Sequence, residues 1–489
     1  MGGAPYQSRG CANCRRRKVK CDLGKPECAR CIKKGAPCLG YIENRNILHH
    51  SLVTRRTPFG NAIRPAPCLV DKFNHLPRLN VVNGNVEVRT QIFSGFMNEL
   101  FPHNTLSDCK DDNWYLLMSH FPSMARESEL VDRSVIALAA TFLANKRGDS
   151  QLIHHAVEIY NSAINGLARM LQRGCQPNLE MFYSMTVFHT YELMQTNVEA
   201  LQNCLTHIQG ATAISKHLDY TIHEEKPFVR AMLTRQKWAT TFFALNTKYA
   251  SQVHCDCLVN GTENSPLDQL FGIVAECATL QRSLDQIKEQ KSLDLPLSCA
   301  ALLSDCQKIE GKLQKNWMTE YAPRLDGGPI SDWSQPKHDP RTLPSRSFLE
   351  PYGFPSLATG KTYILYWVIL LVVRRILYQT ENLLDKAPSL KPMLLCADQI
   401  CRCVAYCMQP RNRISAAQVV LFGISQASQC YIDCADREKF VWCQEIYPLV
   451  STSGFTVVQR LNQEQCNYWN AVQSEVVTKA PMSAENHLT

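Results

Sequence analysis

Apolar residues recur at helical spacing along most of the chain after about residue 91. Clear examples are VDRSVIALAATFLANKR (131–147), IHHAVEIYNSAINGLARMLQ (153–172) and LEMFYSMTVFHTYELMQ (179–195). A repeat of three to four residues places apolar side chains on one face of a helix. Strand patterns are scarce, so the sequence predicts a large all-α domain of stacked antiparallel helices over residues 91–475, followed by a flexible tail at 476–489. Further helices are predicted near 200–218, 228–250, 266–290, 297–317, 360–382, 391–408, 414–430 and 440–475.

The longest apolar run is YILYWVILLVV (363–373), which is closed by Arg374 and Arg375. Eleven residues are too few to span a bilayer, so this run predicts a buried helix and no membrane association. Residues 319–356 are rich in Pro and Gly and predict a surface loop between two helical halves.

Residues 39–90 predict a linker that is partly disordered. They contain four prolines after residue 57 and no heptad of apolar residues that would indicate a coiled coil. Within this segment, RLNVVNGNVEVR (78–89) has alternating valines around Asn83-Gly84 and predicts a β-hairpin; a flexible patch is the alternative.

Composition and charge separate the N-terminus from the rest. Apolar residues make up 45% of the 489 residues and charged residues 20%, which is typical of a soluble globular protein. Residues 1–60 carry thirteen Lys/Arg against three Asp/Glu, a net charge of +10, whereas the whole chain carries +8. This asymmetry favours an N-terminal arm that binds a polyanion.

The opening MGGAPYQSRG has no apolar segment of a secretory signal. The twenty-three cysteines are therefore expected to be reduced thiols in the nucleus or cytoplasm.

Six cysteines lie in residues 11–38, in two copies of the spacing C-x2-C-x6-C. Zinc requires four ligands, and C-x2-C pairs place two thiolates on one ion. Six thiolates satisfy two zinc ions if two sulfurs are shared, and the duplicated motif offers one shared sulfur in each half. We assign Cys11 and Cys28 as the bridges. Cys14 and Cys21 then complete one zinc, and Cys31 and Cys38 complete the other.

GCANCRRRKVKCD, Pro26 and CARCIKKGAPC resemble the fungal binuclear zinc cluster transcription factors across the whole 28-residue motif. The resemblance implies that a short helix after the first C-x2-C enters the DNA major groove and reads a CGG-type triplet. Lys18 is then the principal base contact and Arg17 its assistant, in keeping with Lys and Arg as donors to guanine. The remaining basic residues are expected to contact phosphates: Arg15, Arg16, Lys20, Lys33 and Lys34.

The region 90–470 also resembles, through short motifs, the helical regulatory domain that follows the cluster in many fungal regulators. These motifs are the alanine-rich helix at 135–144, Tyr191-Glu192, HIQGA (207–211) and TYILYW (362–367). Gly210 and Ala211 predict a close approach of two helices, with His207 and Glu192 pairing across it. A structural role is favoured for this pair over ligand binding.

Signatures of catalysis are incomplete. ATGKT (358–362) ends like a phosphate-binding loop, but Pro355 stands where its first glycine belongs. Cys396, Cys403 and Cys407 share one helix face, and Cys430 and Cys434 lie one turn apart. Apolar packing is the favoured interpretation of these cysteines, and a redox-sensing or metal-sensing thiol pair is the alternative.

The sequence therefore predicts a nuclear, zinc-dependent transcription regulator that binds double-stranded DNA and is not an enzyme. Its helical domain is expected to regulate, to form a homodimer or to recruit transcription machinery. Family resemblance favours an activator of one biosynthetic pathway, such as a secondary-metabolite pathway. The alternatives are a sensor whose helical domain binds a small-molecule effector, and a scaffold whose zinc module contacts proteins.

Overall fold

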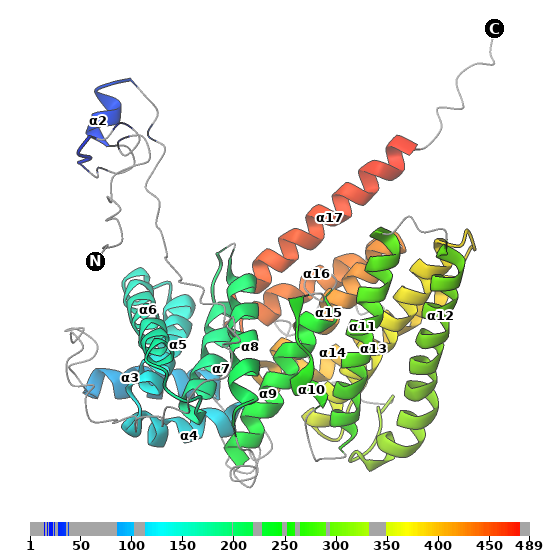
Figure 1. Cartoon of the computed structure of the whole chain (residues 1–489), viewed down its shortest axis with the longest axis horizontal. Coiled ribbons are helices and arrows are strands. Elements are labelled where there is room, and N and C mark those ends of the chain that lie inside the picture. The colour runs from blue at the N-terminus through cyan, green and yellow to red at the C-terminus, as the bar shows by residue number, and fades with distance from the viewer. Residues whose placement is uncertain are drawn as a thin grey trace, which may run out of the picture. The chain divides into compact units, whose positions relative to one another are not determined.

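The chain divides into two compact units, Met1–Pro67 and Cys68–Thr489. We call the described part of the second unit the helical body (Figure 1). The computed structural model describes residues 14, 17, 19–22, 24, 28–35, 38, 86–101, 113–197, 199–218, 227–246, 252–259, 265–289, 294–331 and 349–479.

The helical body is all-α, as predicted, and an isolated bridge between Ile330 and Gly353 is the one β pairing among the described residues. The helix α12 continues into a π-helical segment, Lys312–Tyr321, and a 3-10 turn, Ala322–Arg324. The helices are α3 Val86–Leu100, α4 Asn113–Glu127, α5 Glu129–Arg147, α6 Ser150–Gln172, α7 Leu179–Leu193, α8 Ala200–Ser215, α9 Pro227–Ala244, α10 Asp256–Val259, α11 Pro266–Glu289, α12 Leu295–Gly311, α13 Leu357–Asn382, α14 Lys391–Cys407, α15 Arg413–Asp433, α16 Arg437–Ser451 and α17 Val457–Lys479.

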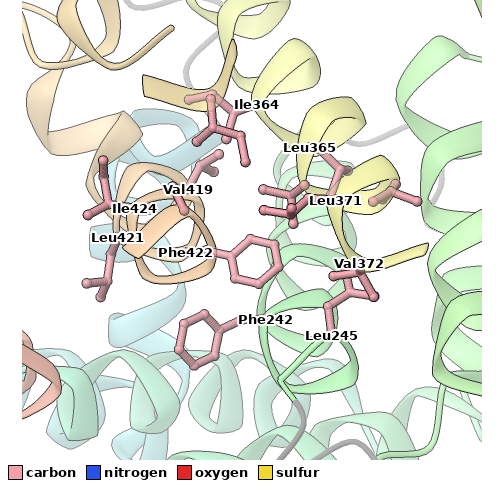
Figure 2. Packing of buried hydrophobic residues seen from close by; sticks show 14 of the residues in the cluster. Phe242, Leu245, Ile364, Leu365, Leu371, Val372, Val419, Leu421, Phe422 and Ile424 are labelled. Atoms are coloured by element: carbon pink, nitrogen blue, oxygen red, sulfur yellow. The ribbon is translucent and has the colours of Figure 1, made fainter. Parts of the chain in front are cut away.

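Two apolar cores hold these helices together. The first lies among α3 to α7, the end of α8 and the start of α9, and the second extends from α8 to α17. Figure 2 shows part of the second core, where Phe242 of α9 meets Phe422 of α15 edge to face, with ring centroids 5.6 Å apart. Val372 of α13 belongs to the same core. Helices that are distant in sequence thus share one buried interior.

The helix α5 illustrates why the predicted helices form. Its N-cap Ser128 accepts a hydrogen bond from the Val131 N–H, and Gly148 ends the helix in the left-handed conformation, with φ 67°. Every residue from Leu130 to Ala144 is buried. The first N–H groups and the last carbonyl groups of a helix have no hydrogen-bond partners within it. A helix that is buried on all sides therefore needs caps that supply these partners, as Ser128 does here.

The helix α13 contains the long apolar run. It is long and apolar enough to cross a membrane by length and composition, but 72% of its most apolar window is buried inside the body. The prediction of a buried helix is confirmed. ATGKT (358–362) forms the first turns of this helix after the N-cap Ser356, so these residues are helical and do not form a phosphate-binding loop.

Two local predictions are wrong. The single helix predicted at 440–475 is two helices, because Gly454, with φ 93°, ends α16 and redirects the chain into α17. The second strand of the predicted hairpin, residues 86–89, is the start of α3, and the first part of the hairpin lies outside the described residues. Ile92, Phe96 and Leu100 recur one turn apart and are buried, so tertiary packing favours a helix over the local valine alternation.

The expected apolar role of the α14 cysteines is confirmed. Cys396, Cys403 and Cys407 are all fully buried in the second core. No disulfide joins the cysteines in the described part of the chain.

Candidate metal centre and nucleic-acid interface

Cysteine side chains form the interior of the N-terminal module. Cys14, Cys28 and Cys31 are fully buried, and Val19, Cys21 and Cys38 pack against them. Ile32, in contrast, is 61% exposed. The described part of the module therefore has too little apolar surface to fold by burial alone, and it depends on bonds made by its thiols.

The thiols lie at distances that suit zinc. Two thiolates on one tetrahedral zinc, each about 2.3 Å from the ion, lie about 3.8 Å apart. The Cys14 and Cys28 Sγ atoms are 3.7 Å apart, and the Sγ atoms of Cys14, Cys28 and Cys31 all lie within 4.8 Å of one another. Cys28 also belongs to a second group, with Cys21 and Asp22. Cys28 therefore lies beside Cys14 and Cys21, which are assigned to one zinc, and beside Cys31, which is assigned to the other, as a bridging thiolate requires.

Local structure positions Cys28 at the start of the short helix α2, Ala29–Ile32. Its backbone is extended and its Sγ accepts a hydrogen bond from the Cys31 N–H, with an N–S distance of 3.4 Å. This donor stabilises a thiolate at Cys28. The C-x2-C spacing therefore brings both the second thiol and a backbone donor to the same sulfur.

Asp22 has a structural role in the module that the sequence did not predict. Its carboxylate accepts hydrogen bonds from the Ala29 N–H at 2.9 Å and the Arg30 N–H at 3.3 Å. The Ala29 N–H holds the pKa of this carboxyl below its ordinary value. Asp22 thus joins the two halves of the motif through its hydrogen bonds to α2. The signal for it was an acidic residue directly after Cys21.

The described basic side chains of the module face solvent. Arg17, Lys20, Lys33 and Lys34 are all exposed, and so is Arg30, which the sequence reasoning did not select. Four of the predicted site residues lie outside the described residues: Cys11, Arg15, Arg16 and Lys18. The second bridging position and the principal base contact therefore stay predictions.

Residues 9–46 match the fungal Zn(2)-Cys(6) binuclear cluster domain. This module is a fungal Zn(2)-Cys(6) binuclear cluster domain. The cluster domain binds two zinc ions through six cysteines, and the described thiols fit that arrangement. Zinc would supply the folding energy of the cluster domain and hold Cys14 and Cys28 together, so that the basic residues between them keep a fixed shape.

Three relatives match short stretches of the chain. The "Oleate activated transcription factor 3" of Kluyveromyces lactis is 62% identical over 29 residues, which are 6% of this chain and 4% of that protein. The "Arginine metabolism regulation protein II" of Saccharomyces cerevisiae is 62% identical over 32 residues, again 6% and 4%. An uncharacterized transcriptional regulatory protein of Schizosaccharomyces pombe is 39% identical over 59 residues, 12% of this chain and 11% of that protein. The matches thus span a small part of the relatives' lengths, and no solved structure matches the chain.

In the helical body, the predicted pair of His207 and Glu192 is present. His207 Nε2 lies 3.9 Å from Glu192 Oε1, and both side chains are buried. The pair is completed by Tyr160, whose hydroxyl donates to Glu192 Oε1 at 2.5 Å and contacts His207 Nε2 at 2.8 Å. Asn203 Nδ2 donates to Glu192 Oε2 at 3.4 Å. The four side chains satisfy one another, which is the arrangement of a structural buried network.

The predicted close approach beside this network is also present. A Cβ atom on Gly210 of α8 would lie 2.0 Å from the Met185 Cε atom of α7. Gly210 therefore allows the side chain of Met185 to lie against the backbone of α8.

Proposed function

We propose that the chain is a sequence-specific, zinc-dependent DNA-binding transcription regulator that acts in the nucleus and catalyses no reaction. The observation that carries the proposal is the cluster domain itself, in which buried thiols at zinc spacing hold exposed basic side chains. A compact cationic surface attracts the phosphate backbone of DNA. The names of all three relatives describe transcription factors or regulators, which supports the same function.

Base recognition is proposed for Lys18, with Arg17 as its assistant, on a CGG-type triplet. Lys and Arg are the usual donors to guanine O6 and N7 in the major groove. Phosphate contacts are proposed for Arg15, Arg16, Lys20, Lys33 and Lys34. Lys33 and Lys34 are exposed at the end of α2, where they can approach a phosphate without displacing other side chains.

The helical body is proposed to regulate this DNA binding and to contact a second copy or the transcription machinery. Two relatives are named for oleate activation and arginine metabolism. These names support a role as an activator of one metabolic pathway, and we propose a biosynthetic pathway of secondary metabolism.

A sensor function would require polar side chains in the helical body that can form hydrogen bonds with an effector. The predicted polar pair Glu192 and His207 is instead closed by Tyr160 and Asn203. This closure supports a structural role for the pair over effector binding at that site.

The proposal is tested by selecting bound sequences from random DNA with the full-length, zinc-loaded protein at fixed salt. We expect enrichment of CGG triplets; two triplets at one spacing would indicate a dimer, and one triplet a monomer. Lys18→Ala should abolish the sequence preference. Absence of any enriched sequence would overturn sequence-specific binding.

Phosphate contacts are tested by salt titration of DNA affinity. Neutralising Lys33 and Lys34 together should weaken all sequences alike and reduce the slope of log affinity against log salt by about two. Neutralising Lys315 and Lys391 together is the matched control, because it removes two exposed charges from the helical body. An equal effect of the control would contradict the assignment.

A further inference from the structure

The helix α12 buries only one of its sides. It is an outer helix of the helical body (Figure 1) and packs against α11 and α13. Its buried side chains recur every three or four residues and form a single stripe: Cys299, Leu302, Cys306 and Ile309. The side opposite this stripe therefore faces away from the body.

The side of α12 that faces away from the body is apolar over its first turns. Leu297 is 74% exposed, and Ala300, Ala301 and Ser304 are exposed as well. These residues lie at positions i, i+3, i+4 and i+7, so they share one face, which we call the outer face of α12. No residue from 295 to 304 carries a charge. A surface helix ordinarily presents charged and polar side chains to solvent, so the outer face has the composition of a contact surface.

The side chains of the outer face allow another helix to come close. Alanine and serine project little from the backbone, and helix axes can approach to about 8 Å where such residues meet. Leu297 lies one turn before Ala300 and Ala301 and supplies a large apolar side chain beside them. In a pair of such faces, the leucine of each helix can lie on the small residues of the other.

Charges at the two ends of the outer face indicate what covers it. Asp294, which precedes the first turn, and Lys308 are both exposed. They lie on opposite sides of Ala301 at seven residues each, which is two helical turns or about 10 Å along the axis. The outer face therefore has a negative end and a positive end at equal distances from its middle.

A second copy of α12 fits this arrangement when the two helices run antiparallel. With a two-fold axis at Ala301, each Lys308 lies beside Asp294 of the partner subunit, and each Leu297 lies beside Ser304 of the partner subunit. Lys308 already binds Asp305 of its own helix at 2.8 Å, but this pair is exposed, and an ammonium group has three donors. A parallel pair would instead place like charges side by side.

We propose that two copies of the chain pair through the outer faces of α12, antiparallel about a two-fold axis at Ala301. The inference rests on the proposed function, in which the helical body contacts a second copy, and it names the surface and the pairing. One pair of short helices buries less than the roughly 1,200 Å² of a standard interface, so the dimer dissociates readily. Two half-sites on one DNA molecule would hold the copies close together, and the contact would then favour binding of both.

The first test measures the mass of the full-length, zinc-loaded protein by sedimentation equilibrium over a series of concentrations, with a reductant and without DNA. We expect an equilibrium between monomer and dimer. Leu297→Glu should raise the dissociation constant at least about tenfold, because it places an unpaired charge in the contact. A protein that is monomeric throughout, or a dimer that Leu297→Glu leaves unchanged, would overturn the proposal.

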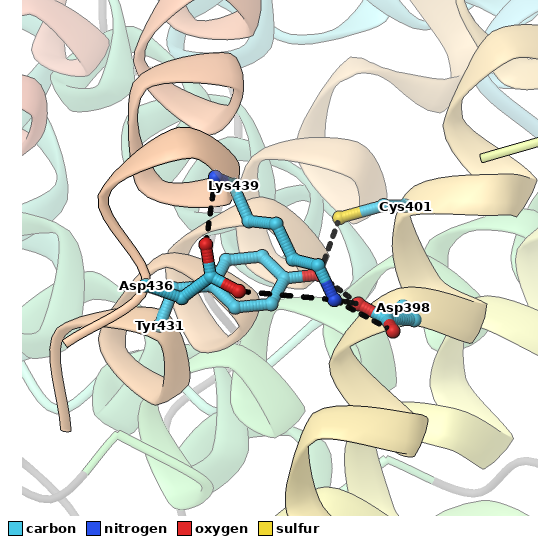
Figure 3. A network of polar contacts seen from close by, with 5 residues as sticks. All are labelled: Asp398, Cys401, Tyr431, Asp436 and Lys439. Carbon is cyan, nitrogen blue, oxygen red and sulfur yellow. Dashed lines mark hydrogen bonds and ion pairs between the residues drawn. The ribbon is translucent and has the colours of Figure 1, made fainter. Parts of the chain in front are cut away.

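Val441→Glu is the matched control. Val441 of α16 is also an exposed apolar residue, at 43%, but Glu438 and Glu445 are exposed on the same helix. The position of α16 is fixed from within the body, since Lys439 Nζ donates to the two carboxylate oxygens of Asp398 at 2.8 Å and 2.9 Å (Figure 3). The control should dimerise like the unaltered protein, and an equal weakening by both variants would contradict the assignment to α12.

Charge reversal tests the antiparallel arrangement. Lys308→Glu should weaken the dimer about tenfold, because the two-fold axis creates two contacts between like charges. Adding Asp294→Lys should restore dimerisation, since opposite charges then face each other again. A double variant as weak as the single one would refute the pairing of these residues. Selection of bound DNA reports on the cluster domain, so failure of the α12 dimer would leave the proposed DNA binding intact.

Discussion

Replacement of Tyr160 by phenylalanine removes one hydroxyl from the centre of the buried network in the helical body. The hydroxyl donates to Glu192 and contacts His207, and burial raises the pKa of Tyr160 well above its ordinary value, so it remains a protonated donor. The phenylalanine ring would keep its stacking on Tyr191, whose ring centroid lies 3.8 Å away. The substitution therefore isolates the hydrogen bonds from the packing.

The expected cost follows from what is left behind. A hydrogen bond to a charged group contributes about 1.5–3 kcal/mol, and a buried acceptor that loses its partner costs more than the bond itself. Glu192 is 1% exposed, so water cannot replace the lost donor, and we expect about 3 kcal/mol in the free energy of unfolding. Tyr183→Phe is the matched control: Tyr183 is equally buried but donates only to the Leu117 carbonyl at 3.3 Å, a loss of about 1 kcal/mol.

The assay is urea denaturation of both variants, followed by far-UV circular dichroism. The Tyr160→Phe midpoint should fall clearly below that of Tyr183→Phe, with unchanged denaturant slopes. Equal midpoints would refute the hydrogen-bond reasoning. A Tyr160→Phe protein as stable as the unaltered protein would show that the network does not stabilise the helical body. That result would favour a role of Glu192 and His207 in binding an effector.

Three further predictions concern metal content, pH and backbone conformation. Elemental measurement should find two zinc ions per chain and none in Cys28→Ser, because the shared thiolate serves both ions; one retained zinc would contradict the sharing. Burial holds the pKa of His189 well below 6.5, so the unfolded chain takes up a proton that the folded chain does not, and stability should fall as the pH decreases from about 6.5, by up to about 1.4 kcal/mol per pH unit. His189→Leu should flatten this dependence in urea titrations at several pH values, and an unchanged slope would assign it to other groups. Gly454→Ala should lower the free energy of unfolding by about 2–4 kcal/mol, because the new Cβ would lie 2.4 Å from the Phe142 ring at a residue with positive φ. Gly148→Ala should lower it by about 1 kcal/mol, because Gly148 has φ 67° but no atom within 4 Å of the new Cβ. Similar losses for the two variants would exclude the steric contribution of Phe142.

Most helices could be predicted because each one carries its own apolar periodicity. The helices α5 and α13 lie close to the predicted ranges, because the apolar residues that they bury follow one another within the same short segment of sequence. The break between α16 and α17 could not be predicted in this way. Gly454 ends the helix where the backbone meets Phe142 of α5, a contact between residues far apart in the chain.

In the candidate site, too, features that depend on local spacing could be predicted, and features that depend on contacts between distant residues could not. The zinc ligands follow from cysteine spacing alone, because C-x2-C pairs carry their geometry within a few residues. The role of Asp22 depends on the chain folding back onto α2, which no local pattern records. Likewise, the pairing of His207 with Glu192 was predictable from two adjacent motifs, whereas the insertion of Tyr160 from a third helix was not.

The helix α13 has a consequence for the way the chain is synthesised. It packs against α11 and α12, which leave the ribosome before it, and against α14 and α15, which leave after it. Its apolar surface is therefore covered on one side and bare on the other until translation has passed residue 433. During that interval the nascent chain exposes an aggregation-prone apolar helix that chaperones have to cover. A truncated gene product that stops before Lys391 would keep this segment exposed permanently, so fragments prepared for expression should extend through α15 or end before α13.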